Sequence, residues 1–365
     1  LDGNFITGTV AHDLTIGTAG YKSQSYSVIT PAKPASVLLG SANINSPVIF
    51  PFPAAGLPNV GLNFDSSTTY QQGVNVGDTM RFSDQWSARL AVSQDWFHVD
   101  NYNAKAVAQP EYADHGLSPT ASLMFKPQSN MTIYTTWASS LQAGDLAPAG
   151  TTNAGTSLAP YRSTEWEAGY KVSLAKIDFT AAVFRIDRPF ANIVPVGANT
   201  VFEISGDQVN KGLELSAVGD VVENLRVYGG VTLLNSRLEQ TPTLATNDKY
   251  YVGAPRVKGN TLWEYSIPAV PGLVATFKYQ FSGTRPANDT NSFFVAGYNL
   301  FDIGARYSSA ILGKQVTWRL AVDNVADRSY WSTVAPSNLT GANTGNLLAH
   351  FGTPRTVLAA VQMDF

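Results

Sequence analysis

The chain has 365 residues, of which 14% are charged, 44% hydrophobic and 11% aromatic, with a formal net charge of −3 and no cysteine. The charged fraction is well below the ~25% typical of soluble globular domains, and no run approaches the ~18 apolar residues of a transmembrane helix. Disulfides, thiolate chemistry and a basic nucleic-acid stripe are excluded, and the four scattered histidines lack metal-ligand spacing. The classes of protein that fit this composition are a large all-β protein and an outer-membrane β-barrel.

Segments in which apolar and polar residues alternate recur along the whole chain. There are about fifteen, each near the ~10-residue length of a tilted membrane strand. In TEWEAGYKV, for example, Trp166 and Tyr170 share a face opposite Glu167. Apolar residues do not recur at helical spacing, so the pattern predicts strands. The clearest segments are residues 86–99, 164–172, 257–267, 272–283 and 355–365.

The connections between these segments alternate between short and long. Short turns are predicted at residues 82–85, 126–130, 173–176, 219–224, 267–272 and 308–314. Long loops are predicted at residues 27–66, 103–116, 141–160, 189–206, 239–254, 285–294 and 326–353. A transmembrane barrel has short periplasmic turns and long extracellular loops. The sequence therefore predicts an all-β, antiparallel, up-and-down transmembrane β-barrel.

The two predicted faces of the strands fit this architecture. Lipid cannot hydrogen-bond a strand backbone, so the sheet must close, with apolar residues outward and polar residues inward. The last strand follows a long loop and should end at the periplasmic rim with Phe365, where pairing with the first strand closes the barrel. The charged residues expected on the inner face are Glu165, Glu167, Lys171, Glu214, Lys258, Glu264, Lys278, Arg306, Arg319 and Asp364.

Three motifs resemble, in their order, those of TonB-dependent outer-membrane receptors of the siderophore-receptor branch. They are Glu167-Ala168-Gly169-Tyr170-Lys171, Gly212-Leu213-Glu214, and the stretch NVADRSY from Asn324 to Tyr330. The resemblance implies a bacterial outer-membrane receptor that takes up a ferric siderophore or a similar scarce, large ligand. It also implies a plug domain in the lumen and energy supplied through TonB. Iron is expected only within a bound siderophore, and no resident metal or cofactor and no nucleic-acid partner is expected.

The chain also departs from the pattern of that family. Members have about 22 strands and an amino-terminal plug, whereas this sequence shows about 14–15 strands and neither a plug nor a TonB-binding segment. We therefore expect residues 1–365 to be the carboxy-terminal two-thirds of a receptor barrel, with Leu1 inside the parent sequence. Alone, such a chain should not perform active uptake. By the same resemblance, Phe365 should be an outer-membrane assembly signal, and its deletion should impair insertion.

Aromatic residues in the long loops are the predicted ligand-binding residues. Rigid rings offer a large contact area at low entropic cost. The alternative is that individual rings anchor at the membrane interface or pack loop against loop. No loop carries a basic cluster, which slightly favours a neutral, hydroxamate-like ligand. The candidates are Tyr112, Tyr161, Tyr250, Tyr251, Phe293, Phe294, Tyr330, Trp331 and Phe351.

Two other functions are weighed against this one. The inward charges would suit a passive porin-like channel, with the loop at residues 27–66 as a constriction. A rim protease would need a water-activating dyad, but Asp95 and His98 are three residues apart on a predicted strand and point to opposite faces. Asp114 and His115 form only an adjacent pair in a loop. The sequence therefore favours a receptor over a channel, and a channel over an enzyme.

Overall fold

The computed structural model describes residues 1–28, 38–44, 47–48, 50–53, 63–103, 105–336 and 347–363. Within these ranges no helix is long and apolar enough to span a membrane. The strands are β1 (Asp2–Thr7), β2 (Val10–Val28), β3 (Asn63–Arg81), β4 (Trp86–Asn101), β5 (Tyr112–Phe125), β6 (Met131–Gln142), β7 (Tyr161–Leu174), β8 (Ile177–Val196), β9 (Asn199–Val222), β10 (Leu225–Glu239), β11 (Lys249–Tyr250), β12 (Val257–Ser266), β13 (Leu273–Ser282), β14 (Arg285–Pro286), β15 (Phe294–Val295), β16 (Tyr298–Ile311), β17 (Lys314–Asp323), β18 (Trp331–Pro336), β19 (Leu347–Phe351) and β20 (Thr356–Met363).

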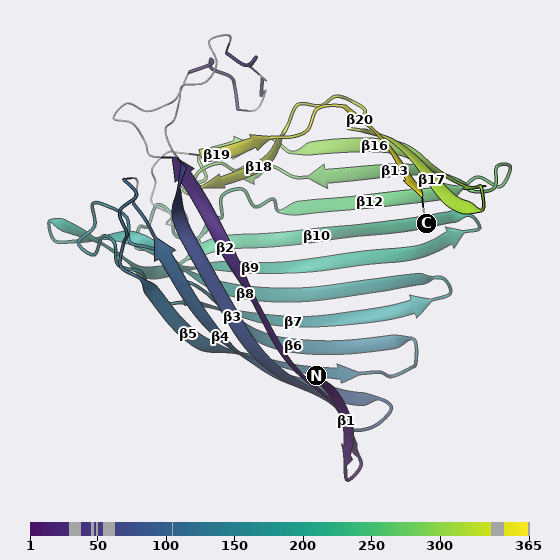
Figure 1. Cartoon of the computed structure of the whole chain (residues 1–365), viewed down its shortest axis with the longest axis horizontal. Coiled ribbons are helices and arrows are strands. Elements are labelled where there is room, and N and C mark those ends of the chain that lie inside the picture. Colours follow the sequence, from purple (N-terminus) through teal and green to yellow (C-terminus); the bar gives the residue numbers. More distant parts are fainter. Residues whose placement is uncertain are drawn as a thin grey trace.

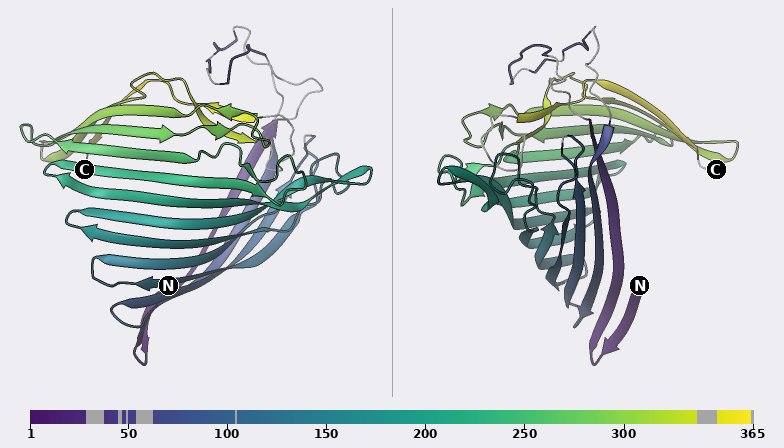
Figure 2. Two further views of the ribbon diagram at one scale, coloured as in Figure 1. Left: turned by 180° about the vertical axis from the view of Figure 1, so that it is seen from behind. Right: turned by 60° about the vertical axis from the view of Figure 1, so that its left-hand side comes forward.

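One antiparallel sheet of sixteen strands forms the body of the molecule. Its main path runs β1-β2-β3-β4-β5-β6-β7-β8-β9-β10-β12-β13-β16-β17-β20, with β11 paired beside β10. Two hairpins, β14–β15 and β18–β19, form separate small sheets. Each strand of the main path pairs with the next, so the predicted all-β, up-and-down arrangement is confirmed. Figures 1 and 2 show this sheet bent into a deep open trough.

The edges of the trough are β1 and β20. In the described part of the chain these two strands do not pair with each other, so the closure expected at the last strand is not formed between them. Both edges leave backbone groups unpaired, which lipid does not tolerate. Phe365 and Asp364 lie outside the described residues, and the assembly role of Phe365 stays a prediction.

The six predicted short turns are all present and lie together at one end of the strands (Figure 1). Three of them are two-residue hairpin turns, at residues 175–176, 223–224 and 312–313, and each contains a residue with positive φ. Leu312 and Gly313 have φ values of 50° and 74°, and Ala175 has a φ of 53°. Positive φ at these positions matches the twist of the flanking strands. The long connections lie at the opposite end, as the alternation predicts.

The predicted long loop at residues 189–206 is wrong, because strands occupy most of it. Strand β8 continues to Val196 and β9 begins at Asn199, with the register shifted between Pro189 and Ala191. Pro189 lacks a backbone N–H and interrupts the ladder locally without ending it. Proline therefore marks a bulge here and not a loop. The predicted loop at residues 326–353 likewise contains the β18–β19 hairpin.

The two faces of the sheet differ in chemistry as predicted. One row of paired residues is entirely apolar and crosses five strands: Trp263, Phe277, Ile303, Val322 and Val357. Phe277 is 40% exposed and Ile303 49% exposed on this face. On the concave face, Arg306 pairs with Glu264 at 2.5 Å and Lys278 with Asp302 at 3.5 Å. A sheet with a continuous exposed apolar face and a charged inner face suits a bilayer.

Glycines in two of the sequence motifs make room for aromatic rings from the neighbouring strand. A Cβ at Gly169 would collide with the ring of Tyr134, and a Cβ at Gly212 with the ring of Phe184. The Tyr134 hydroxyl donates to Glu167 Oε1 at 2.6 Å. Lys171 Nζ lies 5.1 Å from the centroid of the same ring. The spacing Glu-x-Gly-x-Lys thus seats one tyrosine between a carboxylate and an ammonium group.

Replacing Gly169 by alanine should displace the Tyr134 ring and destabilise the sheet. Overpacking of this kind costs about 1–3 kcal/mol, and the hydrogen bond to Glu167 would be lost as well. Thermal unfolding of the folded protein, followed by its change in electrophoretic mobility, should show a lower midpoint. Gly230→Ala is the matched control, because a Cβ there meets nothing closer than 3.5 Å. Equal midpoints for the two variants would contradict the role given to Gly169.

Candidate ligand-binding site

Two of the predicted binding residues are buried at the long-loop end of the sheet. Tyr161 begins β7, is 2% exposed, and packs with Ala147, Ala191 and Phe202. Its hydroxyl donates to Asp145 Oδ2 at 2.9 Å. Tyr112 begins β5, is 7% exposed, and accepts from the backbone of Gly144. For these two rings the placement favours the alternative of loop packing over ligand contact.

A second group joins the loop before β12 to the loop between β14 and β15. Asn291 Oδ1 accepts from the backbone N–H of Tyr250 at 2.6 Å, and its Nδ2 donates to the carbonyl of Tyr250 at 2.9 Å. Burial raises the pKa of the Tyr251 hydroxyl, with Asp289 adding to the rise and Arg188 opposing it. Phe293 and Phe294, by contrast, are 48% and 42% exposed. These two phenylalanines are available for contact from outside.

The last three predicted aromatics lie around the β18–β19 hairpin. The ring centroids of Trp331 and Phe351 are 4.4 Å apart, and those of Tyr330 and Tyr298 are 4.5 Å apart. Trp331 Nε1 donates to the carbonyl of Ile44 at 2.6 Å. Ile44 lies between β2 and β3, near the other edge of the sheet in strand order. The loops of the two edge regions therefore meet at Trp331.

The Asn324 motif fixes the start of this last loop. The backbone N–H of Asn324 donates to Asp302 Oδ1 at 2.8 Å. Its side-chain Nδ2 donates to the carbonyls of Arg328 and Thr353, at 2.9 and 3.0 Å, and its Oδ1 accepts from the N–H of Arg328. Asn324 is only 3% exposed. One side chain thus ties the departing and returning ends of the loop to the sheet.

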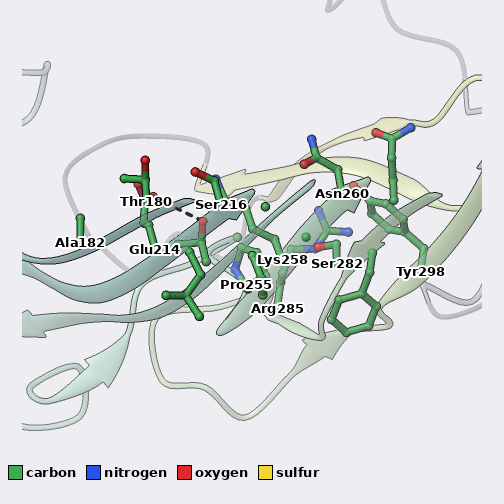
Figure 3. A pocket seen from close by; sticks show the side chains of 18 of the residues that line it. Thr180, Ala182, Glu214, Ser216, Pro255, Lys258, Asn260, Ser282, Arg285 and Tyr298 are labelled. Carbon is green, nitrogen blue, oxygen red and sulfur yellow. Dashed lines mark hydrogen bonds between the residues drawn. The ribbon is translucent and has the colours of Figure 1, made fainter. Parts of the chain in front are cut away.

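A cavity of about 680 Å³ opens on the concave face, between the sheet and the β18–β19 hairpin. The predicted inward residues Glu167, Lys171, Glu214 and Lys258 line it, which confirms their face. Glu214, Lys258, Ser282 and Tyr298 follow one another along the wall in one cross-strand row, with Lys258 between Glu214 and Tyr298 (Figure 3). Of the wall residues that the structure describes, none is one of the nine predicted aromatics. Their binding role stays a prediction.

Among the cavity residues that the sequence analysis missed are Tyr134, Arg285 and Tyr298. Arg285 begins β14 and is 3% exposed. Its Nη1 and Nη2 donate to the carbonyls of Ser332 and Trp331, at 3.2 and 2.6 Å. Its Nε has no hydrogen-bond partner among the described residues, and burial lowers the pKa of this guanidinium. In the sequence, Arg285 stands out only as the single cation of the predicted loop at residues 285–294. That observation gives no indication that its side chain is buried.

The up-and-down sheet, its apolar and charged faces and the loop anchored by Asn324 are accompanied by a match of the sequence to one protein family. Residues 2–325 match the family model described as "TonB dependent receptor-like, beta-barrel". The chain belongs to the TonB-dependent receptor family. Members of this family are bacterial outer-membrane receptors and transporters, so the long-loop end is extracellular and the short-turn end periplasmic. The predicted family and the outer-membrane location are confirmed.

Relatives of known name are longer than this chain. The ferrichrome receptor FcuA of Yersinia enterocolitica is 27% identical over the whole chain, which covers 47% of that receptor. The ferrioxamine receptor of the same organism is 23% identical, with 50% of it covered. Among solved structures, BauA, the ferric preacinetobactin receptor of Acinetobacter baumannii, superposes with a TM-score of 0.80 at 25% identity; the chain covers 53% of it. The chain thus spans about half the length of these relatives.

Proposed function

We propose that this chain is the barrel part of an outer-membrane receptor that takes up a ferric siderophore, energised through TonB in the full-length protein. Family membership carries the proposal, because TonB-dependent receptors import scarce ligands too large for diffusion. Three relatives are named for ferrichrome, ferrioxamine and ferric preacinetobactin, all iron complexes. The plug domain and TonB are the partners proposed for the parent protein, and iron enters only as part of the ligand.

The structure supports this proposal by the position of its cavity. The cavity lies under the β18–β19 hairpin on the concave face, and its wall carries both polar side chains and aromatic rings. Such a mixture suits a bulky chelate with a polar surface. Exposed rings of Phe293 and Phe294 at the loop end could make the first contact. The passive channel considered above is disfavoured, because the family match is to receptors.

Uptake of labelled iron tests the proposal. The full-length receptor that contains this chain should be expressed in an iron-starved bacterium lacking its own siderophore receptors. We expect saturable accumulation of at least one ferric siderophore, abolished when TonB is deleted. Accumulation that is unchanged without TonB would instead establish the passive channel. Accumulation by the 365-residue chain alone, in a TonB-dependent manner, would contradict the expectation that a plug is required.

A further inference from the structure

We propose that the part of the cavity wall formed by Lys258, Arg285 and Tyr298 binds an anionic oxygen group of the ligand, such as a carboxylate or an ionised catecholate. We call these three residues the cationic subsite. The inference rests on the proposed siderophore function and narrows it to a class of ligand. It differs from the sequence-based preference for a neutral ligand.

Arg285 provides the first observation. The side chain is 97% removed from solvent, yet no described carboxylate lies within ion-pair distance of it. Two backbone carbonyls and the ring of Tyr298, 5.5 Å from the guanidinium carbon, are its partners. A buried charge without a counter-ion is costly, and an anion at the cavity wall would offset that cost. The unpartnered Nε leaves one donor of the fork without an acceptor.

Lys258 provides the second observation. It lies in one cross-strand row with Ser282 and Tyr298, because Lys258 pairs with Ser282 and Ser282 pairs with Tyr298. Its side chain is exposed to the lumen and makes no ion pair with any described residue. Two other cations of the concave face are neutralised, Lys278 by Asp302 and Arg306 by Glu264. Among the described cations of the cavity wall, Lys258 and Arg285 have no carboxylate partner, and Lys171 has only the ring of Tyr134.

Two carboxylates, Glu167 and Glu214, also line the cavity, together with Lys171. Glu167 accepts from Tyr134 and Glu214 accepts from Thr232, at 2.6 and 3.3 Å. An anionic ligand group is repelled from these carboxylates and attracted to Lys258 and Arg285.

The charge of an iron complex follows from its chelating groups. Iron(III) with three singly charged hydroxamates is neutral, whereas with three doubly charged catecholates it is strongly anionic. The cationic subsite should therefore bind the anionic catecholate complex more tightly than the neutral hydroxamate complex. The sequence did not indicate this, because Lys258 comes from β12 and Arg285 from the β14–β15 hairpin. Only the fold brings them to one cavity.

Binding to the purified full-length receptor in detergent tests the subsite. The probes are an iron tris(hydroxamate), an iron tris(catecholate) and iron-free citrate, each titrated calorimetrically. Lys258→Gln should weaken binding of the catecholate complex and of citrate about tenfold or more, the effect of one charged hydrogen bond. Binding of the neutral complex should change little, and Lys258→Arg should restore affinity. Arg319→Gln, which removes one charge from the same face outside the cavity, should leave all three affinities unchanged.

The outcomes separate this inference from the proposed function. If the receptor binds iron complexes and Lys258→Gln alters none of the anionic affinities, the subsite is overturned and the siderophore function stands. If neither iron complex binds but citrate binds in a Lys258-dependent manner, the subsite stands and the siderophore function fails. An equal loss of affinity for neutral and anionic complexes would overturn the charge-selective role, because it would indicate damage to the cavity as a whole.

Discussion

Replacing Phe277 by lysine is expected to destabilise the membrane-inserted sheet by about 2–4 kcal/mol, the cost of a cation on the lipid face near the bilayer midplane. Phe277 lies in the middle of β13, in the apolar row between Trp263 and Ile303. Its ring stacks against Phe301, with the centroids 6.3 Å apart. The substitution therefore removes a ring contact and also exposes an ammonium group to hydrocarbon.

Gln280→Lys on the same strand is the matched control. Gln280 lies on the concave face, and its Nε2 donates to Asp302 Oδ2 at 3.2 Å. A lysine there would keep a carboxylate partner and a polar environment. Urea titration of the protein folded into lipid vesicles should show a large decrease in the free energy of unfolding for Phe277→Lys and a small change in it for Gln280→Lys. Equal losses would mean that the row through Phe277 does not face lipid.

Asn324→Ala is expected to release the loop between β17 and β20 and to cost about 2–4 kcal/mol, from three side-chain hydrogen bonds of a buried amide. Two backbone carbonyls, those of Arg328 and Thr353, would lose a donor. The backbone at this position has a φ of 50°, which alanine adopts less readily than asparagine. The loop carries Tyr330 and Trp331, so ligand capture should weaken too.

Trypsin cleavage at Arg328 in intact outer membranes measures this release directly. The rate should rise in Asn324→Ala, and the midpoint of unfolding should fall. Asn324→Gly is the control, because glycine removes the backbone strain but not the loss of hydrogen bonds. If the glycine variant behaves like the wild type, the side-chain bonds contribute little and backbone conformation alone explains the motif. Unchanged cleavage in both variants would refute the anchoring role.

Much of the sheet could be predicted from the sequence because its signals are local. Alternation in TEWEAGYKV assigns each residue to a face without reference to any partner strand. In the structure Trp166 is 58% exposed on the outer face and Glu167 lines the cavity. The short turns were equally readable, since a hairpin needs only a few residues with suitable φ. The alternation of short and long connections then indicated which ends of the strands lie together at each end of the barrel.

The prediction failed where a residue's role depends on distant partners. Residues 189–206, which include Pro189 and Pro195, were predicted as a loop, but the pairing of β8 with β9 extends past both prolines, with a register shift only after Pro189. Tyr161 and Phe293 were indistinguishable as loop aromatics, yet one is 2% exposed and the other 48%. Packing against Ala191 and Phe202 decides the burial of Tyr161, and both residues are remote in sequence.

The sequence by itself therefore determined the strands, their two faces, the turns and the family. Each of these follows from period-two alternation and from motifs within one or two strands. The tertiary structure alone decided the site, because Lys258, Arg285 and Tyr298 meet only through the register of β12, β13 and β16 and the fold of the β14–β15 hairpin. A membrane fixes which residues face outward along every strand, whereas a binding site is set by which strands and loops become neighbours.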